Sequence, residues 1–192
     1  QGFLATSTDA VTWTSRTLTT PATTTINTIT FGASVYLYAG SGGNVATSTD
    51  AITWTARTFG TVSAINSVIF GNSIFVAVGV AGTLRTSTDG VTWTARTSNT
   101  TSTLNSVVWD GTLFHAVGTN THLTSTDGIT WTKNFPGLND TDSVQAAIYT
   151  DKFVIGYFNG GIQTSTNAIT WTNRTSNSPN NIYDFAYNAV WA

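Results

Sequence analysis

The chain of 192 residues contains no cysteine, no methionine and no glutamate, and only 8% of its residues are charged. Without cysteine there is no disulfide framework and no thiolate metal site, which fits a secreted, a virion or a cytosolic protein alike. Seven basic residues and a net charge of −2 leave no basic face for nucleic acid or for an anionic membrane. We therefore expect no nucleic-acid partner and no cofactor.

Long hydrophobic runs are also missing. The most apolar stretch, residues 74–84, is too short to span a bilayer and contains Gly79 and Gly82, so we expect no membrane insertion. Thr alone makes up roughly a fifth of the chain, far above ordinary usage. Thr, Val, Ile and aromatic residues favour strands, whereas Glu and Met would favour helices. The composition predicts an all-β protein with almost no helix.

One phrase recurs through the sequence. Five copies of Ser-Thr-(Asp or Asn)-x-x-Thr-Trp end at tryptophans spaced by roughly 40 residues. The copies occupy residues 7–13, 48–54, 87–93, 125–131 and 165–171. A period of about 40 residues that holds several short strands is the size of one propeller blade.

The repeat over residues 104–132 reads as four antiparallel strands. We expect them at 104–109, at 113–117, at 122–125, and in a fourth segment that begins at 129–132. The dipeptides Asp110-Gly111 and Asp127-Gly128 are strong signals of hairpin turns. The inner strands are the most apolar, as expected if neighbouring blades sandwich them, and the Thr-rich outer strand meets water.

The two ends of the chain predict how the ring closes. Residues 1–4 align with the third strand of a repeat, whereas residues 182–187 and 189–192 align with the first and second strands. Pairing of these N-terminal and C-terminal half-blades would complete a fifth blade and leave no open sheet edge. We predict a single five-bladed β-propeller of four-stranded antiparallel blades over residues 1–192. An open solenoid is the alternative, but it gives no reason for complementary half-repeats.

The recurring phrase resembles the Asp-box, or BNR, repeat of sialidase-like propellers, whose pattern is Ser-x-Asp-x-Gly-x-Thr-Trp. The resemblance covers all five repeats, although Asp and Trp are four residues apart here, so the turn is one residue shorter. In that family the motif lies away from the active site, which implies a structural role. The matching positions are Ser7, Asp9, Trp13, Ser48, Asp50, Trp54, Ser87, Asp89, Trp93, Ser125, Asp127, Trp131, Ser165, Asn167 and Trp171.

The chemistry of the phrase also indicates a structural role. A carboxylate in a tight hairpin accepts hydrogen bonds from the backbone N–H groups that follow it, and a Ser hydroxyl adds another. The Trp ring then buries a large apolar area between sheets. Asn167 replaces Asp in the fifth copy, which a turn would tolerate more readily than a catalytic or metal-binding carboxylate would.

The sialidase mechanism does not transfer to this sequence. The resemblance would require an arginine triad, a Tyr nucleophile with a Glu partner and an Asp acid/base, and the chain has no Glu. Four arginines follow the repeat Trp by three residues, which predicts outer-strand positions far from a central site. These are Arg16, Arg57, Arg96 and Arg174, and Arg85 lies on a third strand.

A carboxylate pair for general glycoside hydrolysis is the rival interpretation. Asp184 is expected on an innermost strand, where other repeats carry uncharged residues, and Asp142 lies in the loop of the adjacent blade. His115 takes a second-strand position that other repeats fill with apolar residues, so we expect a packed core histidine. We expect His122 to be exposed. Two isolated histidines without Cys or Glu make no recognisable metal site.

A near-ring of amides follows the blade-to-blade loops. It comprises Asn27, Asn66, Asn105 and Gln145, with Tyr183 in the fifth place and Asp184 next to it. One interpretation is that these side chains cap the loop that enters each first strand. The other is a polar rim at the channel mouth, which would bind a neutral sugar through amides and an aromatic face.

We interpret the chain as a non-catalytic binding or structural propeller. The composition, rich in Thr, Ser, Asn and Gly, resembles that of phage tail, fibre and decoration proteins and of small five-bladed lectins, so we expect an extracellular or virion-surface location. The expected partner is a neutral glycan or a cell-surface or virion protein, and the chain would serve alone or within a larger chain or assembly. A glycan-processing enzyme built on Asp184 and Asp142 is the alternative.

Overall fold

The computed structural model describes residues 3–18, 25–134 and 143–185. Strands make up its regular structure, and two short 3-10 turns, Ser41–Gly43 and Val80–Gly82, are the only helical elements of the described residues. The described residues include no helix that is long and apolar enough to cross a membrane. The prediction of an all-β fold is confirmed.

Four antiparallel four-stranded sheets follow one another along the chain, and we call each of them a blade. The first blade contains β3 (Ile26–Gly32), β4 (Val35–Gly40), β5 (Val45–Ser48) and β6 (Thr55–Arg57). The second contains β7 (Ile65–Gly71), β8 (Ile74–Gly79), β9 (Leu84–Ser87) and β10 (Thr94–Ala95). The third contains β11 (Leu104–Trp109), β12 (Phe114–Gly118), β13 (Thr121–Ser125) and β14 (Thr132–Lys133). The fourth contains β15 (Val144–Tyr149), β16 (Phe153–Tyr157), β17 (Ile162–Ser165) and β18 (Thr172–Arg174).

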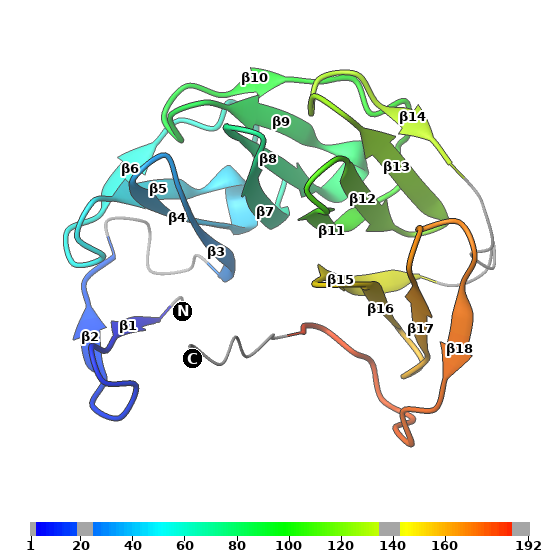
Figure 1. Ribbon diagram of the computed structural model, residues 1–192. Helices are drawn as coiled ribbons and strands as arrows, with labels where there is room; N and C mark the ends of the chain where they lie inside the picture. The colour runs from blue at the N-terminus through cyan, green and yellow to red at the C-terminus, as the bar shows by residue number, and fades with distance from the viewer. Residues whose placement is uncertain (1–2, 19–24, 135–142, 186–192) are drawn as a thin grey trace.

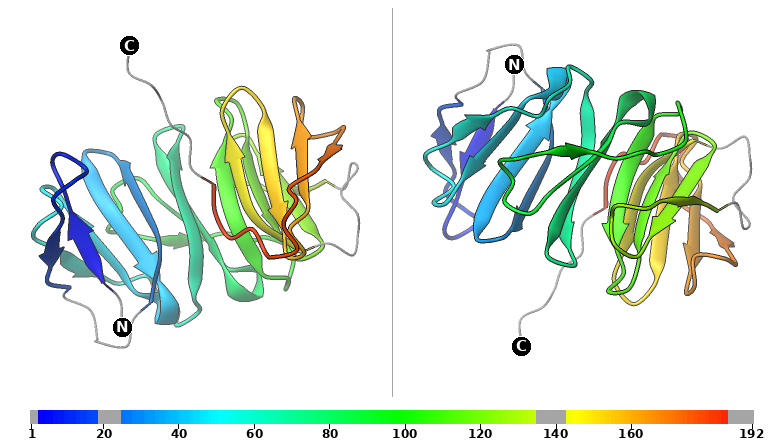
Figure 2. Two further views of the ribbon diagram at one scale, coloured as in Figure 1. Left: turned by 90° about the horizontal axis from the view of Figure 1, so that it is seen from below. Right: turned by 90° about the horizontal axis from the view of Figure 1, so that it is seen from above.

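The blades surround a common axis, with the first strands β3, β7, β11 and β15 innermost (Figure 1). Figure 2 shows the same sheets from two further directions, standing face to face. Strand order within each blade follows chain order, as short hairpin connections require. Between β7 and β8, for example, Asn72 and Ser73 both adopt positive φ (46° and 62°), the left-handed conformation of a tight two-residue hairpin.

A fifth sheet is formed by β1 (Leu4–Thr6) and β2 (Thr14–Arg16), which pair with each other. Leu4 packs with Tyr38 and Trp54 of the first blade. Residues 182–185 take the innermost place beside the fourth blade, where the N–H of Ile182 donates to the carbonyl oxygen of Tyr157 at 3.2 Å. Five sheets around one axis confirm the five-bladed propeller.

Closure of the ring by strand pairing is not seen in the part of the chain that the structure describes. There β1 pairs with β2 alone, and residues 182–185 form no hydrogen-bonded strand. The rest of the expected first and second strands, residues 186–192, lies outside the described residues.

The predicted boundaries of the third blade need one main correction. The first strand agrees, and the second and third are shifted by one residue, but the fourth begins at Thr132 and not at 129. Residues 127–131 instead form the turn, because the side chain of Asp127 holds the backbone N–H groups of Ile129 and Thr130. A clamped turn therefore replaces the first three residues of the expected strand.

The core lies between the blades. Where the second blade meets the third, Val76, Val78 and Leu84 pack against Leu104 and Val107. The interface between the first and second blades repeats this arrangement. The second and third strands are the most buried elements, as β12 and β5 show along their whole lengths, whereas the fourth strands are largely exposed. This gradient matches the expectation that neighbouring blades cover the inner strands and that the outer strands meet water.

Candidate functional site

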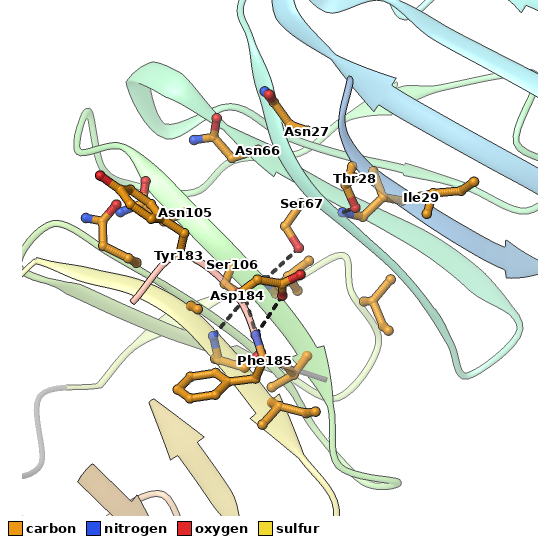
Figure 3. Close-up of a pocket in the computed structure, with 18 of the residues that line it drawn as sticks. Asn27, Thr28, Ile29, Asn66, Ser67, Asn105, Ser106, Tyr183, Asp184 and Phe185 are labelled. Atoms are coloured by element: carbon orange, nitrogen blue, oxygen red, sulfur yellow. Dashed lines mark hydrogen bonds between the residues drawn. The ribbon is translucent and has the colours of Figure 1, made fainter. Parts of the chain in front are cut away.

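The first strands enclose a cavity of about 970 Å³ around the axis of the ring. Its lining comes from residues 26–29, 66–69, 105–109, 145–149 and 183–185. All six candidate ligand-binding residues lie in this lining: Asn27, Asn66, Asn105, Gln145, Tyr183 and Asp184. Figure 3 shows several of them converging on the space from different blades. We call this space the channel.

A β-bulge in each first strand places the amide residues. The register of β7 with β8 shifts between Ile65 and Ser67, so Asn66 is the extra residue, and the other three blades shift at the same place. A bulge redirects a side chain and increases local twist. The predicted ring of amides therefore has a specific backbone cause, which the sequence did not reveal.

Three of the amides join neighbouring blades. Asn27 donates from Nδ2 to the carbonyl oxygen of Ile65 at 2.8 Å, and Asn66 donates to that of Leu104 at 2.9 Å. Asn105 completes the series with the carbonyl oxygen of Val144 at 2.7 Å. Within the described residues no donor reaches the Oδ1 atoms of these amides, so the oxygens remain available as acceptors.

A second ladder of hydroxyl groups runs beside the amides. The N–H of Val68 donates to Thr28 Oγ1, and the N–H of Val107 donates to Ser67 Oγ, each at 3.3 Å. The N–H of Ala147 donates to Ser106 Oγ at 3.2 Å. The Ser106 hydroxyl in turn donates to the carbonyl oxygen of Ala147 at 3.5 Å. The hydroxyl groups of Thr28 and Ser67 each carry a proton that can be donated into the channel.

The fourth and fifth positions of the ring take part in neither the amide bonds nor the hydroxyl bonds that join neighbouring blades. Gln145 donates from Nε2 to Ser143 Oγ at 2.8 Å, within its own blade. Asp184 accepts the N–H of Phe185 at 2.8 Å and is exposed. The Tyr183 ring is 73% exposed, and its hydroxyl accepts a hydrogen bond from Asn181. An aromatic face and one carboxylate therefore interrupt an otherwise neutral rim.

The channel has the chemistry of a hydrogen-bonding site without charge pairs. Among its described lining residues, Asp184 is the only ionisable carboxylate. Asp142, the proposed second carboxylate, lies outside the described residues. Asp110 occupies the predicted turn between a first and a second strand, and Asp151 lies in the corresponding turn of the fourth blade. No group of three or more potential metal ligands occurs among the described residues.

The recurring turns lie at the outer part of the blades, between third and fourth strands. In each, a side-chain oxygen accepts the N–H groups two and three residues ahead, as Asp50 does from Ile52 and Thr53 at 2.8 and 2.7 Å. These bonds, with that of Thr53 the strongest, lower the pKa of Asp50 from 3.8 to about 2. Asn167 makes the same two bonds at 2.9 Å without a charge.

The repeat arginines brace the outer strands. Arg57 donates from Nε to Thr47 Oγ1 at 2.8 Å, and the other three repeat the contact. Three of them join a fourth strand to a third strand, and Arg96 does so from the residue that follows β10. None of the four lines the channel. Arg85 contacts Gly60 and the ring of Phe59 instead. The predicted outer-strand positions are confirmed.

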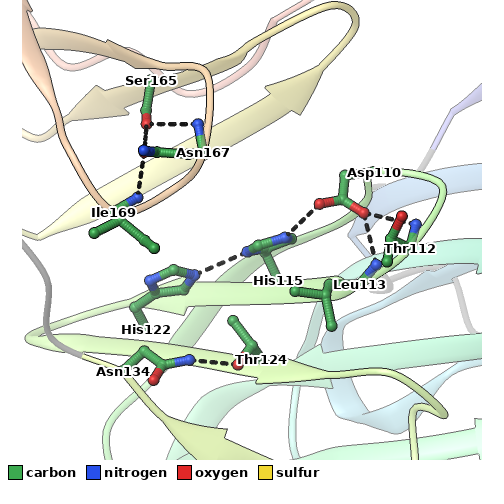
Figure 4. Close-up of polar contacts among 10 residues, drawn as sticks. All are labelled: Asp110, Thr112, Leu113, His115, His122, Thr124, Asn134, Ser165, Asn167 and Ile169. Atoms are coloured by element: carbon green, nitrogen blue, oxygen red, sulfur yellow. Dashed lines mark hydrogen bonds and ion pairs between the residues drawn. The ribbon is translucent and has the colours of Figure 1, made fainter.

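The two histidines form a buried pair in the third blade (Figure 4). His115 is 3% exposed, as expected, but His122 is only 2% exposed, so the expectation of an exposed His122 was wrong. The nitrogens His115 Nδ1 and His122 Nε2 are 3.1 Å apart, and His115 Nε2 lies 3.0 Å from Asp110 Oδ2. The clue in the sequence was the third-strand register, in which His122 takes the place of Leu84.

No family of related sequences matches the chain, and no curated protein matches it in sequence. Solved propeller structures do match its fold. YCF48 from Cyanidioschyzon merolae has a TM-score of 0.68 at 16% identity, covering 95% of this chain and 70% of that one. YCF48 bound to the D1 peptide has a TM-score of 0.65 at 14% identity and 89% coverage, and this chain spans 60% of its length.

An ancestral GH74 enzyme also matches, with a TM-score of 0.62 at 14% identity. The match covers 78% of this chain but only 25% of the enzyme. Similarity at these identities shows the fold alone, because one fold hosts many unrelated functions. The neighbours therefore establish a propeller and leave its function to be argued from the site.

Proposed function

We propose that this chain is a non-catalytic binding propeller whose channel takes a neutral glycan. The observation that carries the proposal is the channel lining, in which amide oxygens and hydroxyl groups from successive blades converge without a charge pair. Sugar hydroxyls both donate and accept hydrogen bonds, and their apolar ring faces pack on aromatic rings. Tyr183 offers such a ring at the channel.

The blade-to-blade ladders support recognition without catalysis. Because Asn27, Asn66 and Asn105 use their Nδ2 groups to join blades, their oxygens are held in fixed positions. Preorganised acceptors reduce the entropy lost on binding. The same bonds make the rim rigid, as a recognition element requires.

The wider role that we propose is recognition at a cell surface or on a virion. The Asp-box resemblance of the turns and the fibre-like composition support a robust extracellular or virion-surface module. Its partner would be a glycan, either free or carried by a surface protein.

A glycan-processing enzyme is the alternative, and the ancestral GH74 enzyme among the structural neighbours favours testing it. Glycoside hydrolysis needs two carboxyl groups that flank the bond. The described channel supplies Asp184 alone, so the enzyme would depend on Asp142. An Asp184→Asn variant separates the two functions, because it removes an acid/base but leaves a hydrogen-bonding oxygen.

A glycan array followed by calorimetry tests the proposal. We expect a neutral oligosaccharide to bind, and Tyr183→Ala to weaken its binding by about tenfold through the loss of a stacking surface. Trp13→Ala is the matched control, since Trp13 is 62% exposed but lies outside the channel. Asp184→Asn should retain binding.

Two outcomes would contradict the proposal. Turnover of the bound glycan that disappears in Asp184→Asn would establish the enzyme. Absence of any glycan ligand, with the chain found as a stoichiometric component of a particle, would indicate a purely architectural protein.

A further inference from the structure

The histidine pair occupies a place that is apolar in the other blades. In the second blade, Val76 and Leu84 face the third blade and pack against its first strand. The first blade uses Leu37 and Val45 in the same way. Strand register puts His115 and His122 at these positions of the third blade, facing the fourth. Two titratable side chains thus occupy positions at which the first and second blades carry apolar side chains.

The hydrogen-bond chain fixes where the protons lie when both rings are neutral. Asp110 is a carboxylate that already accepts the N–H groups of Thr112 and Leu113 at 2.7 and 2.6 Å. His115 must therefore donate from Nε2 to Asp110 Oδ2, which leaves its Nδ1 as an acceptor. His122 then donates from Nε2 to that atom. Its own Nδ1 is buried and has no hydrogen-bond partner in the part of the chain that the structure describes.

Adding one proton to the pair disrupts this arrangement, whether the proton binds to His122 or to His115. A proton on His122 Nδ1 creates a charged N–H group that is buried without an acceptor. A proton on His115 Nδ1 sets two N–H groups against each other across 3.1 Å, unless His122 turns to its other tautomer. That tautomer again places an N–H on the unpartnered Nδ1. Burying a charge and an unsatisfied donor together is costly.

The groups around the pair offer little compensation. The Phe153 ring of the fourth blade meets His115 edge-on, with centroids 4.5 Å apart. Tyr157 packs against Val117, the cross-strand partner of His122, and a phenol stays neutral in acid. Asp151 and Lys152, in the β15–β16 turn, pair with each other at 3.5 Å. Among the described residues, Asp110 is therefore the one charged group in contact with the pair, and of the two rings it contacts only that of His115.

We propose that the buried His115–His122 pair makes the interface between the third and fourth blades acid-labile, so that protonation of the pair opens this interface first. The same interface includes the hydrogen bonds that Asn105 and Ser106 form with the fourth blade at the channel wall. Opening it would break the channel wall at one defined seam.

The direction of the pH dependence follows from the protonation of each state. Burial, reinforced by the charge of His115, lowers the pKa of His122 from 6.5 to about 4. Burial likewise lowers the pKa of His115, although Asp110 opposes the shift. At a pH between the folded-state pKa of about 4 and the unfolded-state pKa of 6.5, His122 binds more protons in the unfolded chain than in the folded one. Acid therefore favours opening. The stabilisation is complete above about pH 6.5 and is lost as the pH falls toward 4.

The composition makes the test unusually clean. The chain has two histidines and no glutamate or cysteine, so no other side chain has an ordinary pKa between 5 and 7. Urea denaturation of the intact chain should show the unfolding constant rising on the order of 100-fold from pH 7 to pH 4.5. Hydrogen exchange should accelerate first in β13 and β16 over the same range.

The other blades supply the matched variant. His115→Val with His122→Leu installs the Val76–Leu84 pair of the second blade, and we expect it to abolish the acid response while keeping the fold at pH 7. Asp127→Asn is the control, because its carboxylate titrates below this range, and it should leave the response unchanged.

Two results would overturn the inference. One is a stability of the native chain that stays constant between pH 7 and pH 4.5. The other is a double variant that retains the full acid response. Should the double variant not fold, nuclear magnetic resonance titration of the native histidines decides the question, since pKa values near 6.5 for both rings would remove the basis for acid lability.

Discussion

At the scale of single residues, the recurring turn shows that geometry and charge are separable. Asp89 accepts the N–H groups of Val91 and Thr92 at 2.8 and 2.9 Å, and Asn167 does the same work in the last copy with a neutral oxygen. The turn therefore requires an acceptor at one position. It does not require an anion there.

This argument predicts how substitutions at Asp89 rank. Asp89→Ala removes the acceptor for both N–H groups and should lower the free energy of unfolding by about 1–2 kcal/mol. Asp89→Asn keeps the acceptor and should lower the free energy of unfolding by only a few tenths of a kcal/mol at neutral pH. Urea denaturation at pH 7 measures both. An Asn variant as unstable as the Ala variant would show that the charge matters after all.

Acid adds a check on the same residue. The N–H groups of Thr92 and Val91 lower the pKa of Asp89 below 3.8. Because the folded-state pKa of Asp89 is lower than the unfolded-state pKa, its carboxylate stabilises the fold at any pH above the unfolded-state pKa. This contribution is lost as the pH falls through the folded-state pKa. The native chain should therefore weaken between pH 4 and pH 2 by more than Asp89→Asn does, because that variant has one fewer carboxylate to protonate.

At the scale of elements, the blades are joined by bulges. Asn66 is the extra residue in β7, and its amide spans to the third blade. A strand with perfect pairing would give each blade only face-to-face packing with its neighbour. The bulge adds a directional bond at the axis, where the blades come closest.

Asn66→Ala should therefore destabilise the fold by about 1 kcal/mol through loss of the bond to Leu104. Gln145→Ala is the matched control, because Gln145 stands at the equivalent bulge but bonds to Ser143 in its own blade. We expect a smaller effect there. Thermal unfolding compares the two, and equal losses would show that the blade-to-blade bond contributes nothing beyond the local one.

The elements also show which features the sequence could predict. The phrase ending in Trp located every blade, because a turn clamped by its own side chains depends on neighbouring residues only. The bulge at Asn66 was not predictable, since it arises from the twist of a strand against other strands. The burial of His122 was missed for a related reason. The sequence alone predicts that an isolated polar residue is exposed. Only the strand register shows that His122 lies on the face that meets the next blade.

At the scale of the whole molecule, the five sheets are unequal. Four have four strands, whereas β1 and β2 form a sheet of two in the described residues. A two-stranded sheet has little stability of its own. The second strands of the complete blades are buried almost throughout, whereas β1 is only partly buried and β2 is largely exposed. Local stability should follow this difference.

Hydrogen exchange at pH 7 measures it. We expect the amides of β8 and β12 to exchange by global unfolding alone, and those of β1 and β2 to exchange many times faster by local opening. Leu4 of β1 packs against Tyr38 and Trp54 of the first blade, and Leu18, which follows β2, joins the same cluster. Equal protection across all five sheets would contradict this expectation, because it would mean that the whole ring opens as one cooperative unit.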